Sequence, residues 1–421
     1  MFLTLVIFII ILGILVFVHE FGHFIVAKKS GMQVEEFGFG FPPRIAGIQK
    51  VDGKWRWVWA HRKISQDQET PTTPSADAAT PPQRGGEAPQ LSSDIPRSLS
   101  SFSKEEYRPQ GGEVVGDPTI YSINAIPLGG FVRILGENNE HEDHPGSFIN
   151  KGFWPRFFTL VAGVLMNVIL AWVILSAGYM IGLPVAIDSL ADVPAHATLT
   201  NPQTAVLDVV KNLPADKAGI KPNDIIQSLD GKKFNSVDDF QQYIDSHEGQ
   251  VINFQVQRGG QHLNIPIAPD LNPAQGQGAT GIEISFLGRL KYTWYMAIWE
   301  GGVATVTGIV GIVYGLYSLF AQHMGFSSLG GPIQIAKLTG QVTGLGFVFL
   351  MQFTAFLSLN LAVLNILPFP ALDGGRVLFL IIEKVRRKRN NQKIEQIVNT
   401  AGFVFLILLM IAVTVHDIIR K

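Results

Sequence analysis

The chain has no cysteine and few charged side chains, and its net charge is close to zero. Without cysteine there is no disulfide framework and no thiolate ligand for zinc, so a metal ion would have to be held by His, Asp or Glu. Charged residues make up 16% of the 421 residues, against roughly 25% in an average soluble protein. The net charge of −1 gives no reason to expect nucleic acid as a partner. With 47% hydrophobic residues and a mean hydropathy of +0.24, the composition indicates a membrane protein.

Four apolar segments are long enough to cross a bilayer as helices, which takes roughly 20 residues. These are Phe2–Ala27, Phe157–Leu183, Leu345–Leu367 and Val398–Val415. The first segment has no basic region before its apolar run and no small-residue cleavage site, so we expect a retained transmembrane helix rather than a signal peptide. The predicted fold class is a polytopic α-helical membrane protein with about four transmembrane helices.

Basic side chains cluster at three ends of these helices. The clusters are Lys28 and Lys29, Lys151 and Arg156, and six Lys and Arg residues in a predicted loop at 384–396. Because cytoplasmic loops carry the excess of Lys and Arg, we expect all three clusters on the cytoplasmic side and the segment between the second and third helices outside. This orientation requires that a fifth apolar stretch, Trp294–Phe320, does not cross. We interpret it as an interfacial or re-entrant element within a connecting region at 273–342.

Two further regions have the character of β-structure. Residues 29–64 and 113–150 alternate apolar and polar residues and predict one membrane-associated sheet or hairpin region. They are separated by residues 65–112, which are rich in Pro, Ser, Thr, Gln and Gly and are predicted to be a disordered insertion. Residues 196–272 predict an extracytoplasmic α+β domain, with a helix capped by Ser236 and a hairpin turning at Gly259-Gly260.

The first apolar segment contains the sequence HEFGH, with His19, Glu20 and His23. On an α-helix, residues four apart share one face, so the two imidazoles can bind one zinc ion. Glu20 lies beside them, where it can act as a base towards a water molecule. The alternative is a buried polar cluster that only joins helices, but three ionisable residues in one turn at membrane depth favour a functional site.

A zinc site of this kind needs a third protein ligand. Asp373, in NILPFPALDGGR, precedes the basic loop by about the same margin as the histidines precede Lys28. The two motifs are therefore expected at similar depth in the membrane. Taken alone, Asp373-Gly374-Gly375 is an ordinary turn after a helix; together with HEFGH it is a candidate ligand.

These motifs give a specific resemblance. HEFGH and NILPFPALDGG, supported by FGFGFPPRI, YSINAIPLGGFVRILGE and GPIQIAKLTG, resemble the site-2 protease family of intramembrane zinc metalloproteases, in its bacterial branch that regulates sigma-factor signalling. The stretch Ala215–Phe234 resembles a PDZ domain, without a clear glycine-rich carboxylate-binding loop. The resemblance implies Zn²⁺ as cofactor, with His19, His23 and Asp373 as ligands and Glu20 as general base.

Five more residues are candidates for holding substrate. By the resemblance these are Asn365 and, with less support, Asn360; the others are Asn167, Gly129 and Gly130. For Asn167 the alternative is an interhelical hydrogen bond. For the two glycines, close approach of a substrate strand and a simple bend in the hairpin remain open.

The predicted function is intramembrane zinc endoproteolysis of single-pass membrane proteins in a bacterial cell (inner) membrane. Substrates would be anti-sigma-factor-like proteins already cut by an upstream site-1 protease, or remnant signal peptides, and membrane lipids are the other expected partners. One alternative is a non-catalytic membrane scaffold that binds through its PDZ-like domain. Another is a zinc transporter or sensor, which would be expected to show several intramembrane His or Asp sites along a pathway.

Overall fold

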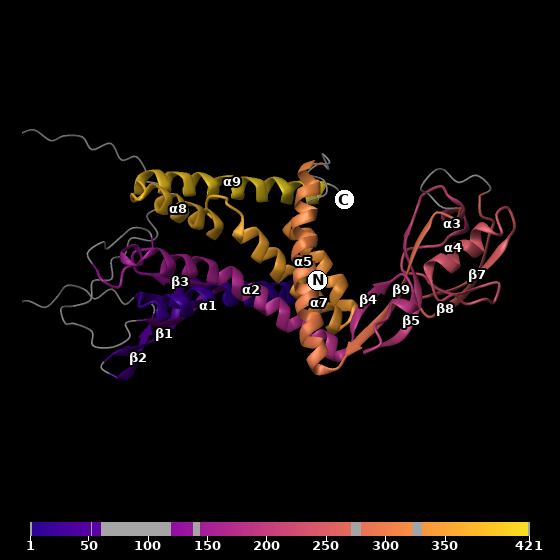
Figure 1. Cartoon of the computed structure of the whole chain (residues 1–421), viewed down its shortest axis with the longest axis horizontal. Helices are drawn as coiled ribbons and strands as arrows, with labels where there is room; N and C mark the ends of the chain where they lie inside the picture. The colour runs from indigo at the N-terminus through magenta and orange to yellow at the C-terminus, as the bar shows by residue number, and fades with distance from the viewer. Residues whose placement is uncertain are drawn as a thin grey trace, which may run out of the picture.

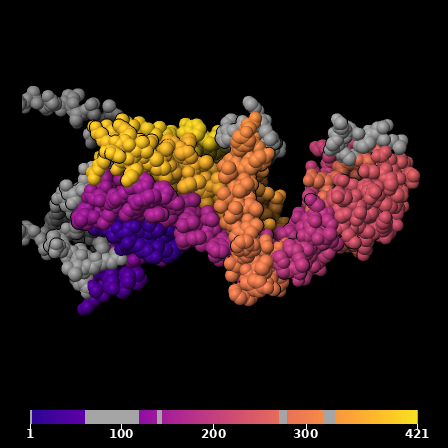
Figure 2. Space-filling model, in the orientation of Figure 1, coloured from indigo at the N-terminus to yellow at the C-terminus, as the bar shows by residue number. Residues whose placement is uncertain are grey.

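The computed structural model describes residues 2–51, 53–59, 119–137, 144–270, 279–321 and 331–419. The predicted insertion at 65–112 lies outside these residues. The chain forms a helical part and a separate α+β domain, which we call the soluble domain (Figure 1). In the space-filling view a narrow neck connects the two (Figure 2).

Four helices of the helical part correspond to the four predicted spans. They are α1 (Phe2–Lys29), α2 (Phe153–Ile181), α7 (Phe347–Ile366) and α9 (Gln392–Ile419). The shorter helices α6 (Pro332–Leu345) and α8 (Asp373–Arg386) lie on either side of α7 in the chain, and η2 (Phe148–Asn150) precedes α2. Helix α2 is central and packs against α1, α5, α7 and α8. The predicted basic loop is shorter than 384–396, because α8 continues to Arg386 and α9 already begins at Gln392.

The fifth apolar stretch forms one uninterrupted helix, α5 (Trp294–Ala321), so the re-entrant interpretation is wrong. Glycine costs only about 1 kcal/mol in a helix and this stretch has no proline, so packing against α2 and α7 is enough to keep it helical. By length and composition, α5 is one of five described helices that could cross a membrane. In Figure 1, however, it runs across the direction of α1, α2 and α9. Its interfacial placement stays a prediction.

The predicted β-regions on the two sides of the insertion form one antiparallel sheet in the order β2-β1-β3. Its strands are β1 (Val34–Val51), β2 (Lys54–Trp59) and β3 (Ile120–Ile134). The first half of β3 pairs with both halves of β1, so that Ser122 faces Gly38 and also Gly47. The second half of β3 runs along α1. The sheet is anchored where Val34 and Ile134 join a buried cluster with Ala27 of α1 and Leu160 of α2.

The soluble domain is built on a six-stranded antiparallel sheet in the order β4-β9-β5-β6-β7-β8. The strands are β4 (Leu183–Ile187), β5 (Ala197–Val209), β6 (Ile225–Leu229), β7 (Ile252–Arg258), β8 (Gln261–Ile267) and β9 (Ile282–Tyr292). The helical elements are η3 (Leu190–Asp192), α3 (Pro214–Ala218) and α4 (Val237–Asp245). The domain extends beyond 196–272 at both ends, because β4 pairs with β9 and β9 pairs with β5.

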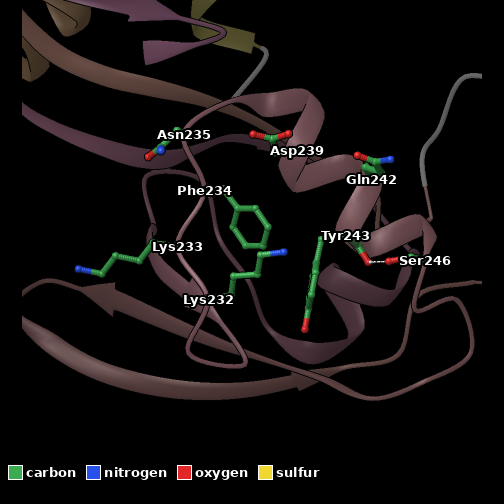
Figure 3. Close-up of a pocket in the computed structure, with 8 residues that line it drawn as sticks. All are labelled: Lys232, Lys233, Phe234, Asn235, Asp239, Gln242, Tyr243 and Ser246. Carbon is green, nitrogen blue, oxygen red and sulfur yellow. Dashed lines mark hydrogen bonds between the residues drawn. The ribbon is translucent and has the colours of Figure 1, made fainter. Parts of the chain in front are cut away.

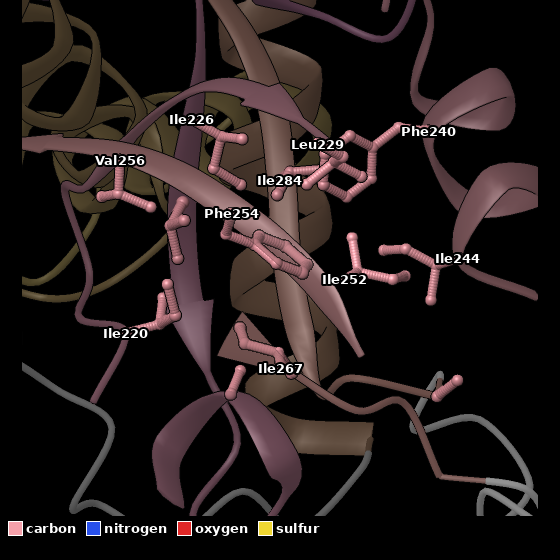
Figure 4. Packing of buried hydrophobic residues seen from close by; sticks show 13 residues of the cluster. Ile220, Ile226, Leu229, Phe240, Ile244, Ile252, Phe254, Val256, Ile267 and Ile284 are labelled. Atoms are coloured by element: carbon pink, nitrogen blue, oxygen red, sulfur yellow. The ribbon is translucent and has the colours of Figure 1, made fainter. Parts of the chain in front are cut away.

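A single apolar cluster fills the soluble domain (Figure 4). Phe240 of α4 and Phe254 of β7 are among its fully buried members. The local predictions for this domain are confirmed: the Ser236 hydroxyl accepts from the Asp239 N–H at 3.1 Å, and the hairpin turns at Gly259 and Gly260, both with positive φ.

Candidate active site

The two histidines of HEFGH lie on one face of α1, and the structure brings Asp373 to the same point. His19 Nε2 is 2.8 Å from Asp373 Oδ2, and His23 Nε2 is 3.2 Å from His19 Nε2 and 3.4 Å from Asp373 Oδ2. The three potential ligand atoms all lie within 4.8 Å of one another. Both imidazoles are buried. Among the residues that the structure describes, this is the one cluster with the donor atoms and spacing of a metal site.

Asp373 reaches the histidines because the chain turns sharply after α7. The helix ends at Ile366, before Pro368 and Pro370, and Asp373 is the first residue of α8. The turn is so tight that a Cβ atom at Gly374 or Gly375 would overlap the backbone carbonyls of residues 366–369. The two glycines of the LDGG motif are therefore required for the backbone to fold back on itself and present the carboxylate.

Each imidazole is oriented by a contact from α2. His23 Nδ1 donates to the carbonyl oxygen of Thr159 at 2.6 Å, which leaves Nε2 as the free ligand atom. His19 Nδ1 lies 3.2 Å from the side-chain amide of Asn167, which is fully buried. The Asn167 Oδ1 atom has no partner. Because the two ends of an amide are assigned by their contacts, turning this amide over lets Oδ1 accept from His19 Nδ1–H, the tautomer that metal binding through Nε2 requires.

Helix α2 also leaves room beside the ligand atoms. A Cβ atom at Gly163 would lie 2.7 Å from His19 Nε2 and would also overlap His23 Nε2. Only glycine fits at this position, so the space next to the two nitrogen atoms is kept open. Three converging ligand atoms, two oriented imidazoles and this opening fit a zinc ion with one position left for a further ligand.

Glu20 lies next to the cluster and faces the sheet. Its Oε2 accepts a hydrogen bond from the backbone N–H of Val132 in β3 at 3.2 Å. The second half of β3 is an outer strand of the sheet, so a strand edge borders the candidate base. Cβ atoms at Gly129 and Gly130 would meet Val16 and Phe17, so the close approach that these glycines permit is to α1.

The asparagine candidates separate into two groups. Asn365 Nδ2 is 3.4 Å from His19 Nε2 and Asn167 contacts the other nitrogen of the same ring, so both border the cluster. Asn360 instead donates to the Phe356 carbonyl of its own helix at 2.8 Å, and the structure does not bring it to the cluster.

The sequence analysis missed several residues that surround the site. They are Thr159, Gly163, Val132 and the ion pair between Arg376 and Glu137. This ion pair links the first turn of α8 to the turn that follows β3, so it connects the segment after the strand beside Glu20 to the helix that carries Asp373. One signal was available for it: Arg376 directly follows the LDGG motif, and Glu137 ends the ILGE sequence.

The soluble domain carries a separate hollow of about 460 Å³ between residues 232–235 and α4 (Figure 3). The Lys232 ammonium lies over the rings of Phe234 and Tyr243, at 5.5 and 5.2 Å from their centres. None of the predicted site residues lines this hollow.

A histidine pair with a neighbouring glutamate on one transmembrane helix, completed by a distant aspartate, defines a metalloprotease that works inside the membrane. Residues 7–60 and 112–409 match the model of peptidase family M50. The chain therefore belongs to this family. It is an intramembrane zinc metalloendopeptidase with zinc as its cofactor and a multi-pass membrane protein, which confirms the predicted class of fold and enzyme.

Two relatives and one solved structure illustrate the similarity. The chain is 30% identical to the regulator of sigma-W protease RasP of Bacillus subtilis, over 99% of this chain and 98% of that protein. It is also 30% identical to a putative zinc metalloprotease of Clostridium perfringens, over 96% and 95%. The PDZ domain of an SdrC-like protein from Listeria monocytogenes is 24% identical, covers 21% of this chain and 92% of its own, and has a TM-score of 0.18.

Proposed function

We propose that His19, His23 and Asp373 hold the zinc ion and that Glu20 is the general base for cleavage of a peptide bond inside the bilayer. The convergence of three ligand atoms within 4.8 Å beside Glu20 carries this proposal. Zinc bound there would polarise the scissile carbonyl and lower the pKa of a water molecule to about 7. Glu20 then takes a proton from water and delivers it to the leaving amine. The Asn365 amide, whose Nδ2 is 3.4 Å from His19 Nε2, would donate to a carbonyl group of the substrate.

The substrate has to be unwound before its backbone can reach this site, because a transmembrane helix satisfies its own hydrogen bonds. We propose that an unwound segment pairs with the outer edge of β3 near Val132, as an added strand. The hydrogen bond from Val132 to Glu20 supports this, since it puts a strand edge beside the base. A photocrosslinking map without substrate contacts along residues 129–134 would exclude it.

The substrates that we propose are single-pass membrane proteins. Anti-sigma-factor-like proteins trimmed by an upstream site-1 protease are one class, for which the similarity to the regulator of sigma-W protease gives support. Remnant signal peptides are the other. The three basic clusters favour a bacterial cell (inner) membrane orientation with Lys28, Lys151 and Arg386 in the cytoplasm and the soluble, PDZ-like domain outside.

Outside the membrane, the soluble domain would act as a gate that excludes substrates with bulky outer domains. It can be removed cleanly, because Leu183 pairs with Leu290 across β4 and β9. Joining these two residues through a short Gly-Ser turn should keep α2 and α5 in place. We expect this variant to cleave untrimmed substrate that the full chain rejects. Unchanged selectivity would exclude the gate.

The catalytic proposal is tested by comparing the wild type with Glu20→Gln. Cleavage of a tagged single-pass helix is measured in detergent, and bound zinc is quantified by elemental analysis. We expect cleavage to fall by about 10²–10⁴-fold, the usual contribution of a general base, with zinc retained. The control is Glu283→Gln, which removes an exposed carboxylate from the soluble domain. Full activity of Glu20→Gln would contradict the proposed role.

A further inference from the structure

The loop between α7 and α8 contains a strained residue two positions before Asp373. Ala371 has a φ of +75°, in the left-handed region where the Cβ atom of an L-residue crowds the following carbonyl oxygen. Most other non-glycine residues of the described chain in this region are asparagine or aspartate, which tolerate it better. An alanine persists in this conformation only where its surroundings hold it there.

Asn399 of α9 makes a contact that can hold it. The Ala371 N–H donates a hydrogen bond to Oδ1 of Asn399 at 3.2 Å. The N–H groups of Phe369 and Leu372 donate to carbonyl groups of the loop itself, and its two prolines have no N–H to donate. The hydrogen bond from Ala371 therefore ties this loop to a different helix.

Helix α9 approaches the loop closely one turn after Asn399. A Cβ atom at Gly402 would lie 2.6 Å from Cβ of Pro370 and 2.7 Å from its carbonyl oxygen. Further along α9, the ring of Phe405 lies 5.8 Å from the ring of Phe369. Along α9, which is described from end to end, Gly402 is the one buried residue. The place where α9 packs most closely is therefore the loop that leads to Asp373.

We propose that Asn399 is a positioning residue for the third zinc ligand, an inference that rests on the zinc site proposed above. Its amide holds Ala371 in the left-handed conformation, and this conformation turns the chain so that Asp373 reaches the two histidines. Gly402 allows α9 to come close enough for the contact.

Loss of this contact has a defined consequence for zinc binding. Without the Asn399 amide, Ala371 relaxes towards an ordinary negative φ, and the Asp373 carboxylate leaves the cluster in a fraction of the molecules. The apparent zinc affinity then falls in proportion to the fraction in which Asp373 is still in place. Glycine at position 371 adopts a positive φ without this strain, so it should favour the original loop even when the contact is missing.

The test measures zinc affinity of the full-length chain in detergent, by competition with a chelator. The variants are Asn399→Ala and Gly402→Ala, each alone and combined with Ala371→Gly, and Ala371→Gly alone. Thr400→Ala, at the exposed next position of α9, is the matched control. Asp373→Ala gives the affinity of the site without its third ligand. The melting temperature of each metal-free chain shows whether the variant is folded.

We expect Asn399→Ala and Gly402→Ala each to lower zinc affinity by roughly tenfold, and Asp373→Ala to lower it further. Adding Ala371→Gly should raise the affinity of both α9 variants several-fold. Alone, Ala371→Gly should change the affinity by less than about twofold, because the wild-type loop is already in place. Metal-free melting temperatures should be similar throughout.

Two results would overturn the proposal while leaving the zinc site intact. Wild-type affinity in Asn399→Ala would show that the amide does not hold the loop. A loss that Ala371→Gly does not recover would show that Asn399 acts through general packing and not through the conformation of the loop. In both cases Asp373→Ala still weakens zinc binding. Wild-type affinity in Asp373→Ala would instead contradict the zinc site itself.

Discussion

The core of the soluble domain and the buried face of helix α2 are formed by different kinds of side chain. The core of the soluble domain consists of large apolar residues around Phe240 and Phe254. The buried face of α2, in contrast, is formed mainly by small or polar residues. These include Thr159, Ala162, Gly163, Asn167, Ala171, Ser176 and Gly178. In water apolar burial drives folding, but in lipid a helix gains nothing by hiding Leu from Leu, so close packing and hydrogen bonds decide which face points inward.

This difference explains how the two parts depend on the sequence. In the soluble domain a position matters through the volume that it fills. On α2 a position matters because it leaves space beside the imidazoles or orients them. Gly163 leaves space next to His19 and His23, and the Thr159 carbonyl group and the Asn167 amide orient the two rings. We therefore expect the soluble domain to be destabilised by replacing a large residue with a small one, and the site on α2 to be disrupted by replacing a small residue with a larger one.

The largest effect is expected from emptying the core of the soluble domain. Phe254→Ala should lower the free energy of unfolding of that domain by about 3–5 kcal/mol, because it removes a fully buried ring and leaves a cavity. Hydrogen exchange of β6, β7 and β8 in the full-length chain measures this. The control is Val251→Ala, at a position that is 63% exposed. Zinc content should not change, and loss of zinc would show that the two parts are not independent.

The opposite change, which adds one carbon atom to α2, should weaken zinc binding in the helical part. Gly163→Ala puts a Cβ atom 2.7 Å from His19 Nε2. We expect zinc affinity to fall by about 100-fold, at least as much as loss of an outer partner of a metal ligand costs. Zinc competition with a chelator measures it. Gly311→Ala on α5 is the matched control, since nothing lies within 4 Å of that added atom. Equal affinity in both variants would contradict the proposed ligand geometry.

The chemistry of the site was predictable, whereas its supports were not. HEFGH predicts two ligands and a base by helical spacing, and the similar distance of Asp373 from a basic cluster predicts the third. Thr159 and Gly163 were missed because their role depends on how α2 is rotated against α1, and no periodicity in either sequence defines that rotation. Contacts such as His23 to Thr159 join residues 136 positions apart.

The extent of the soluble domain shows the same limit. Local signals gave the Ser236 cap and the Gly259-Gly260 hairpin correctly, since each depends on neighbouring residues. The pairing of β4 with β9 does not depend on neighbouring residues, because it joins Leu183 to Leu290 across the whole domain. Likewise, the orientation of the basic clusters suggested a re-entrant element at Trp294–Phe320, whereas these residues form one continuous helix.

A smaller effect on zinc affinity is expected from replacing Asn167. This substitution tests whether the polar contact from α2 orients His19. Asn167→Ala removes the acceptor for His19 Nδ1–H and should reduce zinc affinity by about 10–100-fold. Asn167→Asp keeps an acceptor and should retain most of the affinity. Equilibrium zinc binding distinguishes the two. If both variants bind zinc as the wild type does, Asn167 makes only an interhelical contact with Ser358, whose hydroxyl donates to its backbone oxygen.

The smallest effect concerns the buried carboxylate of the soluble domain, Asp224. Burial alone would raise its pKa, but the Arg258 guanidinium, at 2.7 and 2.6 Å, and the Lys221 N–H outweigh burial and hold that pKa below its ordinary value of 3.8. The unfolded state therefore binds more protons in this range, and stability is lost as pH falls through 3.8 towards the folded-state pKa.

We expect Asp224→Asn to destabilise the soluble domain by about 1.5 kcal/mol at pH 7, the lower end of the range for hydrogen bonds to charged groups, because asparagine keeps one acceptor oxygen. The difference from wild type should shrink steadily below pH 4 as the wild-type carboxylate becomes protonated. Hydrogen exchange, corrected for the intrinsic rate at each pH, follows it, with Asp245→Asn as an exposed control. Asp230 also has a lowered pKa, because the Asn253 N–H donates to it. Asp230 is present in both the wild type and Asp224→Asn, so its contribution to the pH dependence cancels in the difference between them. A difference that does not depend on pH would mean that Asp224 acts through packing and not through its charge.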